Sequence, residues 1–191
     1  MSEPTGTQDA VTAPWATDLL DFWFKDVGEA GWWSHDPALD ADVAARFADL
    51  WAEQRSQPAE TFLDRADHAL AAILLFDQLP RNMFRGESQA FTTDPLARDI
   101  AHGAVAQGYD VQIGGAGRTF FYMPFLHSED LADQQLSLRL FEGAGDENSL
   151  AFARDHHAVI ERFGRFPHRN AALGREDRPG EAEAIAQGQG W

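Results

Sequence analysis

The chain has 191 residues, of which 44% are hydrophobic and 12% aromatic, and it carries a formal net charge of −16 with no cysteine. These proportions are typical of one globular domain and not of a disordered chain. The lack of cysteine excludes disulfides, thiolate metal sites and a cysteine nucleophile. The acidic charge disfavours a nucleic-acid partner, because affinity for nucleic acids comes largely from neutralising phosphates.

The sequence also bears on location and domain organisation. No apolar run approaches the roughly 20 residues that span a bilayer, and the first residues lack the basic and apolar regions of a signal peptide. We therefore predict a cytoplasmic protein with no membrane partner. We expect a flexible N-terminal segment over residues 1–13, a single domain over 14–187 and a tail over 188–191.

Helical patterns follow one another along the chain. Asp36 and Pro37 are typical of a helix N-cap and first helical position. The segment 67–79 is apolar nearly all round its middle, which predicts a buried central helix that ends near Leu79, because Pro80 cannot continue it. The predicted helices cover residues 17–24, 36–55, 67–79, 93–108, 128–143 and 149–164, and a short last helix opens near Pro179.

Strand signals are weak. The best strand candidate is TFFYMPFL, residues 119–126, but Pro124 interrupts it. The sequence GGAG at 114–117 predicts a flexible loop, and Ser128 is the expected N-cap of the helix after it. We predict an all-α single domain of about seven to eight helices in stacked antiparallel pairs.

The first polar cluster is FDQLPRNMFR, residues 76–85. Asp77, Arg81 and Arg85 are spaced four apart and would share one face of an unbroken helix. Arg81 and Asn82 have two interpretations. They bond the carbonyls left free at a helix end, or they present polar groups to a carboxylate or phosphate ligand.

The second polar cluster is FLHSED, residues 125–130. Capping accounts for Ser128 and for the two acidic residues after it, but it does not account for His127. A histidine beside Glu129 and Asp130 is suited to general acid–base catalysis, with Glu129 as its partner. His127 with Glu129 or Asp130 is also a possible part of a divalent metal site.

A third cluster is RDHHAV, residues 154–159, where adjacent helical residues point about 100° apart. His156 shares the apolar side of its helix, so it is the inward candidate, and His157 faces out. A lone inward histidine is more often a hydrogen-bonded core residue than a ligand, and no metal-binding spacing such as HExxH is present.

The fourth cluster is RFGRFPHRN, residues 162–170. Gly164 stands where a left-handed helix end is wanted, and Pro167 prevents continuation of the helix. Such a corner needs one or two polar side chains. The polar residues beyond that need, which we interpret as a ligand-binding group, are Arg165, His168, Arg169 and Asn170.

Cofactor motifs are missing. GGAGRT lacks the lysine, the spacing and the preceding strand of a phosphate-binding loop, and no GxGxxG is present, so no cofactor is evident.

Four blocks carry a resemblance to a known family: LLDFWF, DQLPRNMFRG, FFYMPFLHSEDLADQQ and HHAVIERFGRFPHRNAALGR. In this order, over roughly residues 18 to 175, they resemble successive blocks of a bacterial family catalogued as domain of unknown function 924. The resemblance implies an all-helical fold similar to tetratricopeptide-repeat superhelices. It implies no biochemical activity.

Three functional hypotheses follow. The preferred one is a small-molecule enzyme or binder for an anionic ligand, a carboxylate or phosphate. Arg81, Arg165 and Arg169 would hold the anion, and His127 and Glu129 would supply acid–base chemistry. It predicts that Arg81, His127 and Arg169 converge on one cavity.

The second hypothesis is a helical scaffold that binds a peptide or protein, with Trp32 and Trp33 as exposed aromatic contacts. The third is a buried polar network that only joins helix ends, with function elsewhere.

Overall fold

The computed structural model describes residues 13–186. Residues 1–12 and 187–191, which contain nearly all of the expected flexible segment and the whole expected tail, lie outside the described residues. The helices in chain order are α1 (Pro14–Asp21), η1 (Phe22–Val27), α2 (Gly28–Trp32), α3 (Pro37–Gln54), η2 (Ala59–Phe62), α4 (Ala66–Ile73), η3 (Leu74–Gln78), α5 (Leu79–Met83), η4 (Ser88–Phe91), α6 (Asp94–Ala106), α7 (Tyr109–Ile113), α8 (Gly115–Leu126), α9 (Leu131–Ala144), α10 (Glu147–Phe163), η5 (Pro167–Arg169) and α11 (Glu181–Ala186).

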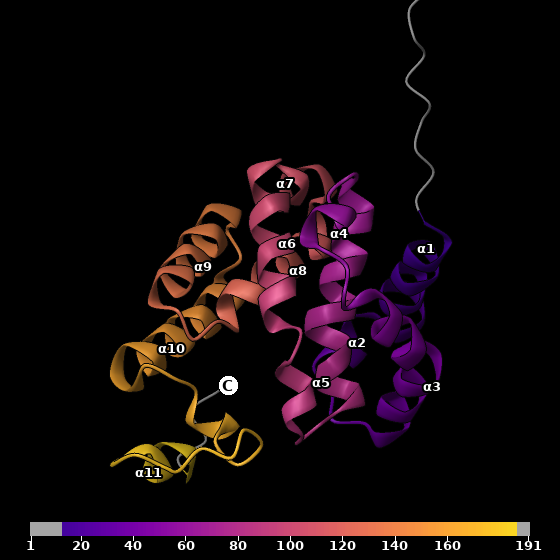
Figure 1. The fold of residues 1–191 in the computed structure, drawn as a ribbon. Coiled ribbons are helices and arrows are strands. Elements are labelled where there is room, and N and C mark those ends of the chain that lie inside the picture. Colours follow the sequence, from indigo (N-terminus) through magenta and orange to yellow (C-terminus); the bar gives the residue numbers. More distant parts are fainter. Residues whose placement is uncertain (1–12, 187–191) are drawn as a thin grey trace, which may run out of the picture.

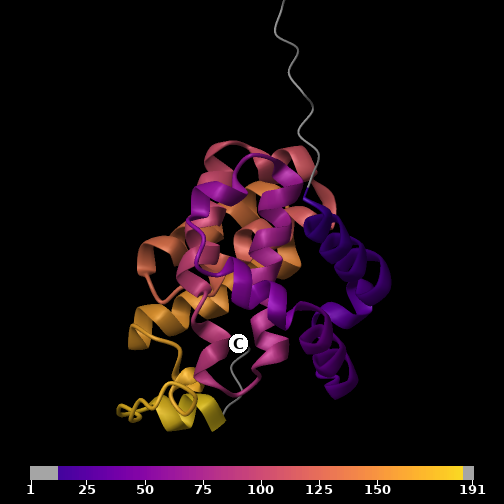
Figure 2. The ribbon, with the colours of Figure 1, turned by 45° about the vertical axis from the view of Figure 1, so that its right-hand side comes forward.

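The all-α prediction is confirmed, and residues 13–186 contain no strand. Helices pack in pairs, among them α9 with α10, α8 with α9, α4 with α6 and α3 with α5. In Figure 1, α4, α6 and α8 occupy the middle, with α1 and α3 on one side and α9 and α10 on the other. Figure 2 shows the C-terminal segment with α11 on the side away from α1 and α3.

The core lies around α4 and α8. As the sequence predicted, the segment 67–79 is buried through its middle. Aromatic side chains fill the space between the helices, and Trp23, Phe76, Phe120 and Phe125 are fully buried. The apolar faces of α4 and α8 therefore fix the positions of the residues that follow them.

The prediction that the central helix ends near Leu79 is wrong. The chain passes from α4 through the wider turn η3 into α5, and Pro80 lies inside this continuous helix. Proline lacks the N–H that would bond the carbonyl four residues earlier, which belongs to Phe76. Thr93 Oγ1 donates to that carbonyl at 2.7 Å instead, so the helix continues without a buried unpaired acceptor.

The segment GGAG differs from the prediction, whereas residues 119–126 are helical, as the all-α prediction requires. GGAG is not a loop, and the best strand candidate is helical, because α8 begins at Gly115 and contains Pro124. Gly114 and Gly115 have φ of 63° and 51°, which turn the chain sharply from α7 into α8. The two glycines start a helix here and do not interrupt one.

The ends of the last long helices are partly as predicted. Gly164 ends α10 with φ of 68°, the left-handed conformation that the sequence predicted. The N-cap of α9 is Asp130 and not Ser128, since the Asp130 side chain accepts from Ala132 N at 2.7 Å. Ser128 instead accepts from Asp130 N and donates to Asp133. Within residues 13–186, no helix is long and apolar enough to cross a membrane.

Candidate functional site

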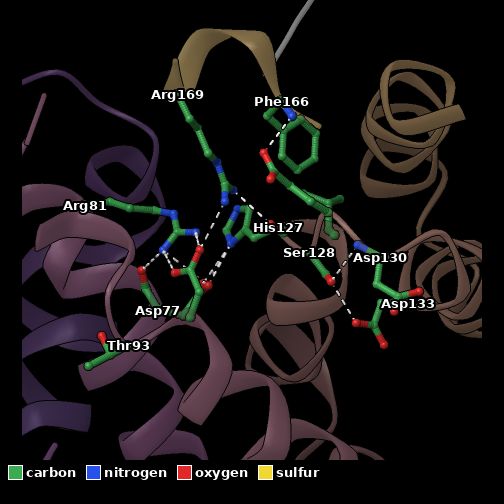
Figure 3. A network of polar contacts seen from close by, with 12 residues as sticks. Asp77, Arg81, Thr93, His127, Ser128, Asp130, Asp133, Phe166 and Arg169 are labelled. Carbon is green, nitrogen blue, oxygen red and sulfur yellow. Dashed lines mark hydrogen bonds and ion pairs between the residues drawn. The ribbon is translucent and has the colours of Figure 1, made fainter. Parts of the chain in front are cut away.

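The site is built around a contact between Asp77 and His127. Asp77 lies in η3 and is 0% exposed, and His127 directly follows α8. Nδ1 of His127 lies 2.8 and 2.9 Å from the two carboxylate oxygens of Asp77 (Figure 3). Burial by itself raises the pKa of the Asp77 carboxyl. Arg81 and His127 outweigh it and hold this pKa well below its usual range.

This contact determines the tautomer of His127. An ionised carboxylate can only accept, so Nδ1 carries the proton and, in the neutral ring, Nε2 keeps a lone pair. Burial and then the charge of Arg81 lower the pKa of His127, against the opposing effect of Asp77. The ring is therefore neutral at pH 7. Asp77 holds a base whose free nitrogen is Nε2.

Two arginines complete the centre, and both bond Asp94 at the start of α6. Arg81 donates to the two Asp94 carboxylate oxygens at 3.0 and 3.2 Å and also to the backbone oxygen of Asp77. Arg169 donates to Asp94 at 3.2 Å and to the backbone oxygen of His127 at 2.8 Å (Figure 3). Arg81, His127 and Arg169 therefore lie together, but of the three only His127 lines the cavity between α2, α8 and the start of α10, so the predicted convergence on one cavity is met only in part.

Arg169 is unusually buried for an arginine, at 6% exposed. Its guanidinium lies 4.7 Å from the ring centres of both Phe91 and Phe166, and its Nε has no hydrogen-bond partner. Burial and then the neighbouring charge of Arg81 lower the pKa of Arg169 to about 10. The guanidinium stays charged at pH 7, so the centre combines a neutral histidine with two cations, the half-buried Arg81 and the buried Arg169.

His127 faces a cavity of about 840 Å³ between α2, α8 and the start of α10. This volume is typical of small-molecule sites. Trp33 and Phe152, two of its lining residues, are 59% and 58% exposed. The lining residues are Glu29, Trp32, Trp33, Gly115, Ala116, Thr119, Phe120, Met123, Leu126, His127, Asp146, Asn148, Ser149, Phe152 and His156.

A second histidine lines the same cavity. His156 is buried, as expected from its place on the apolar side of α10, and its ring packs against Phe166. Nδ1 of His156 lies 2.9 Å from the backbone oxygen of Phe152, which can only accept, so Nδ1 carries the proton. Burial and then the nearby His127 lower the pKa of His156 to about 4, so this ring is also neutral at pH 7.

Two of the predicted ligand-binding residues lie apart from this centre and tie α5 to α3. Asn82 donates to Asp40 at 2.8 Å, and Arg85 donates to both carboxylate oxygens of Asp40 at 2.7 and 2.8 Å. Arg85 follows the end of α5 and does not share the face on which Asp77 and Arg81 meet.

Glu129, the predicted catalytic partner of His127, bonds elsewhere. It accepts from the backbone N of Phe166 at 2.7 Å and from Arg175 at 2.8 and 3.1 Å. With Asp130 capping α9, neither acid makes a hydrogen bond to His127. Within residues 13–186, no group of three or more His, Asp or Glu residues is placed to hold a metal ion.

The remaining predicted residues belong to the C-terminal segment. Arg165 donates to Glu181 at 2.8 and 2.7 Å, and Asn170 donates to Glu181 at 2.9 Å. The Arg165 guanidinium lowers the pKa of Glu181 to about 2. His168 is exposed and packs against Phe166. This corner therefore brings one residue, Arg169, to His127.

The comparison with known proteins agrees with this architecture. Residues 19–189 match the family model described as bacterial protein of unknown function (DUF924). The chain belongs to the DUF924 family. The structure is also similar to that of the protein of unknown function ATU0120 from Agrobacterium tumefaciens, with a TM-score of 0.83 and 42% identity. That match covers 91% of this chain and 97% of the other. The search among curated proteins found no match.

These findings establish membership of the DUF924 family, and neither description names an activity. The likeness to tetratricopeptide-repeat superhelices stays a prediction. The site of this DUF924 protein is therefore interpreted from its own geometry.

Sequence reasoning missed three residues of the centre. Asp94 was recognisable only as part of an Asp-Pro helix start, yet it bonds both Arg81 and Arg169. Phe152 was recognisable only as part of the apolar side that it shares with His156, and Phe91 carried no signal, because their contacts depend on helices that meet only in the folded chain.

Proposed function

We propose that this DUF924 protein is an enzyme that acts on a small molecule bound in the cavity, with His127 as the general base. One observation carries the proposal. A neutral histidine, oriented through Nδ1 by the buried Asp77, lies in the wall of a cavity of about 840 Å³. Nε2 is the nitrogen left for a ligand, and a carboxylate-oriented imidazole is a recurring arrangement for proton transfer.

The chemistry assigned to His127 is removal of a proton from the substrate. The substrate bond to hydrogen breaks, its electron pair stays on the substrate, and the proton moves to Nε2. Asp77 stabilises the imidazolium that forms, at 2.8 and 2.9 Å from Nδ1. Arg81 and Arg169 lie close to His127, and their charges favour the negative charge that develops on the substrate.

The arginine-rich corner led us to expect an anionic ligand. In this proposal that anion is the deprotonated substrate. Neither Arg81 nor Arg169 lines the cavity, and both already bond Asp94. Their contribution is therefore the positive field at His127, and an anionic ligand does not need to contact them directly.

Binding of a peptide or protein is the second candidate, favoured by the exposed Trp33 and Phe152 at the cavity. It predicts binding that does not depend on His127, because the aromatic side chains would supply the contacts.

The proposal is tested with His127→Asn. The asparagine amide keeps a donor for Asp77 and removes the base, so the fold is preserved and proton transfer is lost. Purified wild-type protein is incubated with a bacterial small-molecule extract, and the change in each compound is followed by mass spectrometry. The matched control is His157→Asn, which makes the same substitution at the histidine that follows His156 in α10.

We expect one or more compounds to be converted by the wild type and by the control but not by His127→Asn. Conversion that is equal in all three proteins contradicts the proposal. So does the absence of any conversion by the wild type.

A further inference from the structure

The two cavity histidines have the same protonation pattern. In both rings Nδ1 is held by an acceptor of the protein, the Asp77 carboxylate for His127 and the Phe152 carbonyl for His156. No hydrogen bond from residues 13–186 reaches either Nε2. Neither nitrogen is among the fully buried polar atoms that lack a partner. Since both rings line the cavity, two imidazole lone pairs are open to a ligand.

The lone pairs on the two Nε2 atoms determine which polar group of a ligand binds favourably beside them. A neutral imidazole nitrogen without its proton accepts a hydrogen bond and repels an ionised carboxylate or phosphate oxygen. An uncharged hydroxyl or N–H group has a proton to donate to either ring. The charges of Arg81 and Arg169 close to His127 disfavour a cationic head group at the same place.

The side chains that line the cavity determine what kind of molecular skeleton fits it. Trp32, Trp33 and Phe152 contribute aromatic surface, and no Lys or Arg is among the lining residues. Trp33 stacks on the buried Phe120, with ring planes 15° apart and centres 6.0 Å apart, so Phe120 supports the exposed Trp33 ring as a flat wall. A planar, largely apolar ligand matches such a wall through stacking.

We propose that the cavity binds a planar, largely apolar molecule with an uncharged, weakly acidic hydroxyl group, the chemistry of a phenol, and that His156 is a second residue that contacts this group. The inference rests on the proposed function, since it uses His127 as the base. The hydroxyl donates its hydrogen bond to one of the two Nε2 atoms. When His127 takes the proton, the O–H bond breaks, an N–H bond forms at Nε2 and the oxygen keeps the electron pair.

The ligand class is tested with four probes that share one fluorinated ring. These are 4-fluorophenol, 4-fluoroanisole, 4-fluorobenzoate and 4-fluorobenzylamine, and ¹⁹F NMR follows the titration of each with the full chain. Fluorophenol offers the hydroxyl proton, and fluoroanisole replaces that proton with a methyl group. The benzoate and the benzylamine carry a negative and a positive head.

We expect fluorophenol to bind tightest, with fluoroanisole at least about tenfold weaker, the ratio expected for one hydrogen bond of about 1.4 kcal/mol. Of His127→Asn and His156→Asn, the variant that removes the acceptor of the hydroxyl proton raises the Kd for fluorophenol by about tenfold. The other variant raises it by less, because one hydroxyl proton serves one Nε2 at a time. His157→Asn leaves the Kd unchanged, and circular dichroism confirms that all three variants fold.

Tightest binding by the benzoate or the benzylamine, or no binding by any probe, overturns the ligand class. Equal binding of fluorophenol to the wild type and to His156→Asn overturns the role of His156. The conversion of extract compounds by the wild type and not by His127→Asn would still support the proposed function in those cases. The two failures are therefore distinguishable.

Discussion

Asp77 is the residue on which the centre depends, because a fully buried carboxylate needs compensation for its lost hydration. Gln78 and His127 donate to its side chain, and Arg81 lies 3.3 Å from it. The arrangement holds Asp77 ionised, fixes the ring of His127 and leaves one nitrogen for a ligand.

Removing the charge of Asp77 is expected to destabilise the protein. Asp77→Asn leaves the half-buried Arg81 with less compensation and removes the charge partner of His127, and we expect the free energy of unfolding to fall by about 2–3 kcal/mol. Urea denaturation measures the change. The matched control is Asp64→Asn, which removes a half-exposed carboxylate from the contact with His68, and here we expect less than about 1 kcal/mol. Equal losses in the two variants would contradict the account.

His156 gives the stability a predictable dependence on pH. Its pKa is about 4 in the folded protein and about 6.5 in the unfolded chain, so the unfolded chain binds more protons between these values. The free energy of unfolding is therefore not reduced by this residue well above pH 6.5, and it falls as the pH decreases from 6.5 towards 4.

Between pH 6.5 and 5 this residue is expected to cost about 1.6 kcal/mol, since the unfolded histidine is half protonated at pH 6.5 and the full 1.36 kcal/mol per pH unit applies only below that. In His156→Asn that part of the loss disappears, and unfolding curves at several pH values measure it. His157→Asn serves as the control. A pH dependence that is the same in the wild type and in His156→Asn would show that this account of His156 is wrong.

At the scale of elements, the sequence predicted most helices and several of their ends, because the signals are local. Asp36 and Pro37 begin α3, and Gly164 ends α10. Pro80 was misread because its effect depends on Thr93, which lies 17 residues from the carbonyl that it bonds. No local pattern shows that the carbonyl of Phe76 has another donor.

Glycine has opposite effects in two helices. In α8 a Cβ on Gly117 would lie 2.6 Å from Ile113 Cγ2 and 3.3 Å from Leu70, whereas in α9 a Cβ on Gly143 would meet nothing within 4 Å. Alanine is normally the better helix former by about 1 kcal/mol. We therefore expect Gly143→Ala to raise the melting temperature and Gly117→Ala to lower it. Thermal unfolding checks both, and a rise in both variants would contradict the packing around Gly117.

At the scale of the whole molecule, the described segment after Gly164 is held to the core mostly by polar contacts. Val159, Ile160 and Phe166 form an apolar cluster separate from the main core. Glu129 bonds Arg175 and the backbone of Phe166, and Arg169 reaches Asp94. The segment after Gly164 therefore carries Arg169 to a centre built from η3 and α8.

Glu129→Gln is expected to loosen this segment and to leave the rest of the fold intact. The amide loses the ion pair with Arg175 and is a weaker acceptor for Phe166 N. Hydrogen exchange should show protection that falls about tenfold in residues 164–186 and is unchanged in α4 and α8, since local opening has its own free energy. An equal loss of protection in residues 164–186, α4 and α8 would contradict the view that the segment after Gly164 opens separately.

The candidate site was only partly predictable from the sequence. His127, Arg81 and Arg169 stood out because their residue types exceeded what helix ends need. Their partners are long-range, since Asp77 lies 50 residues before His127 and Asp94 lies 75 residues before Arg169. The same surplus also drew in Arg165 and Asn170, which bond Glu181. The residue types alone do not show whether a polar side chain belongs to a candidate site or joins two parts of the fold.

The most direct test of the account is the tautomer of His127 at pH 7. Long-range ¹H–¹⁵N correlation of the imidazoles in histidine-labelled protein reports which nitrogen carries the proton, and His127→Asn assigns the signal. His102 is the internal reference, because its Nε2 contacts Asp133 at 3.0 Å and the opposite tautomer is expected. The account predicts a neutral His127 with the proton on Nδ1 and a bare Nε2. A proton on Nε2, in the neutral or the charged ring, would contradict it.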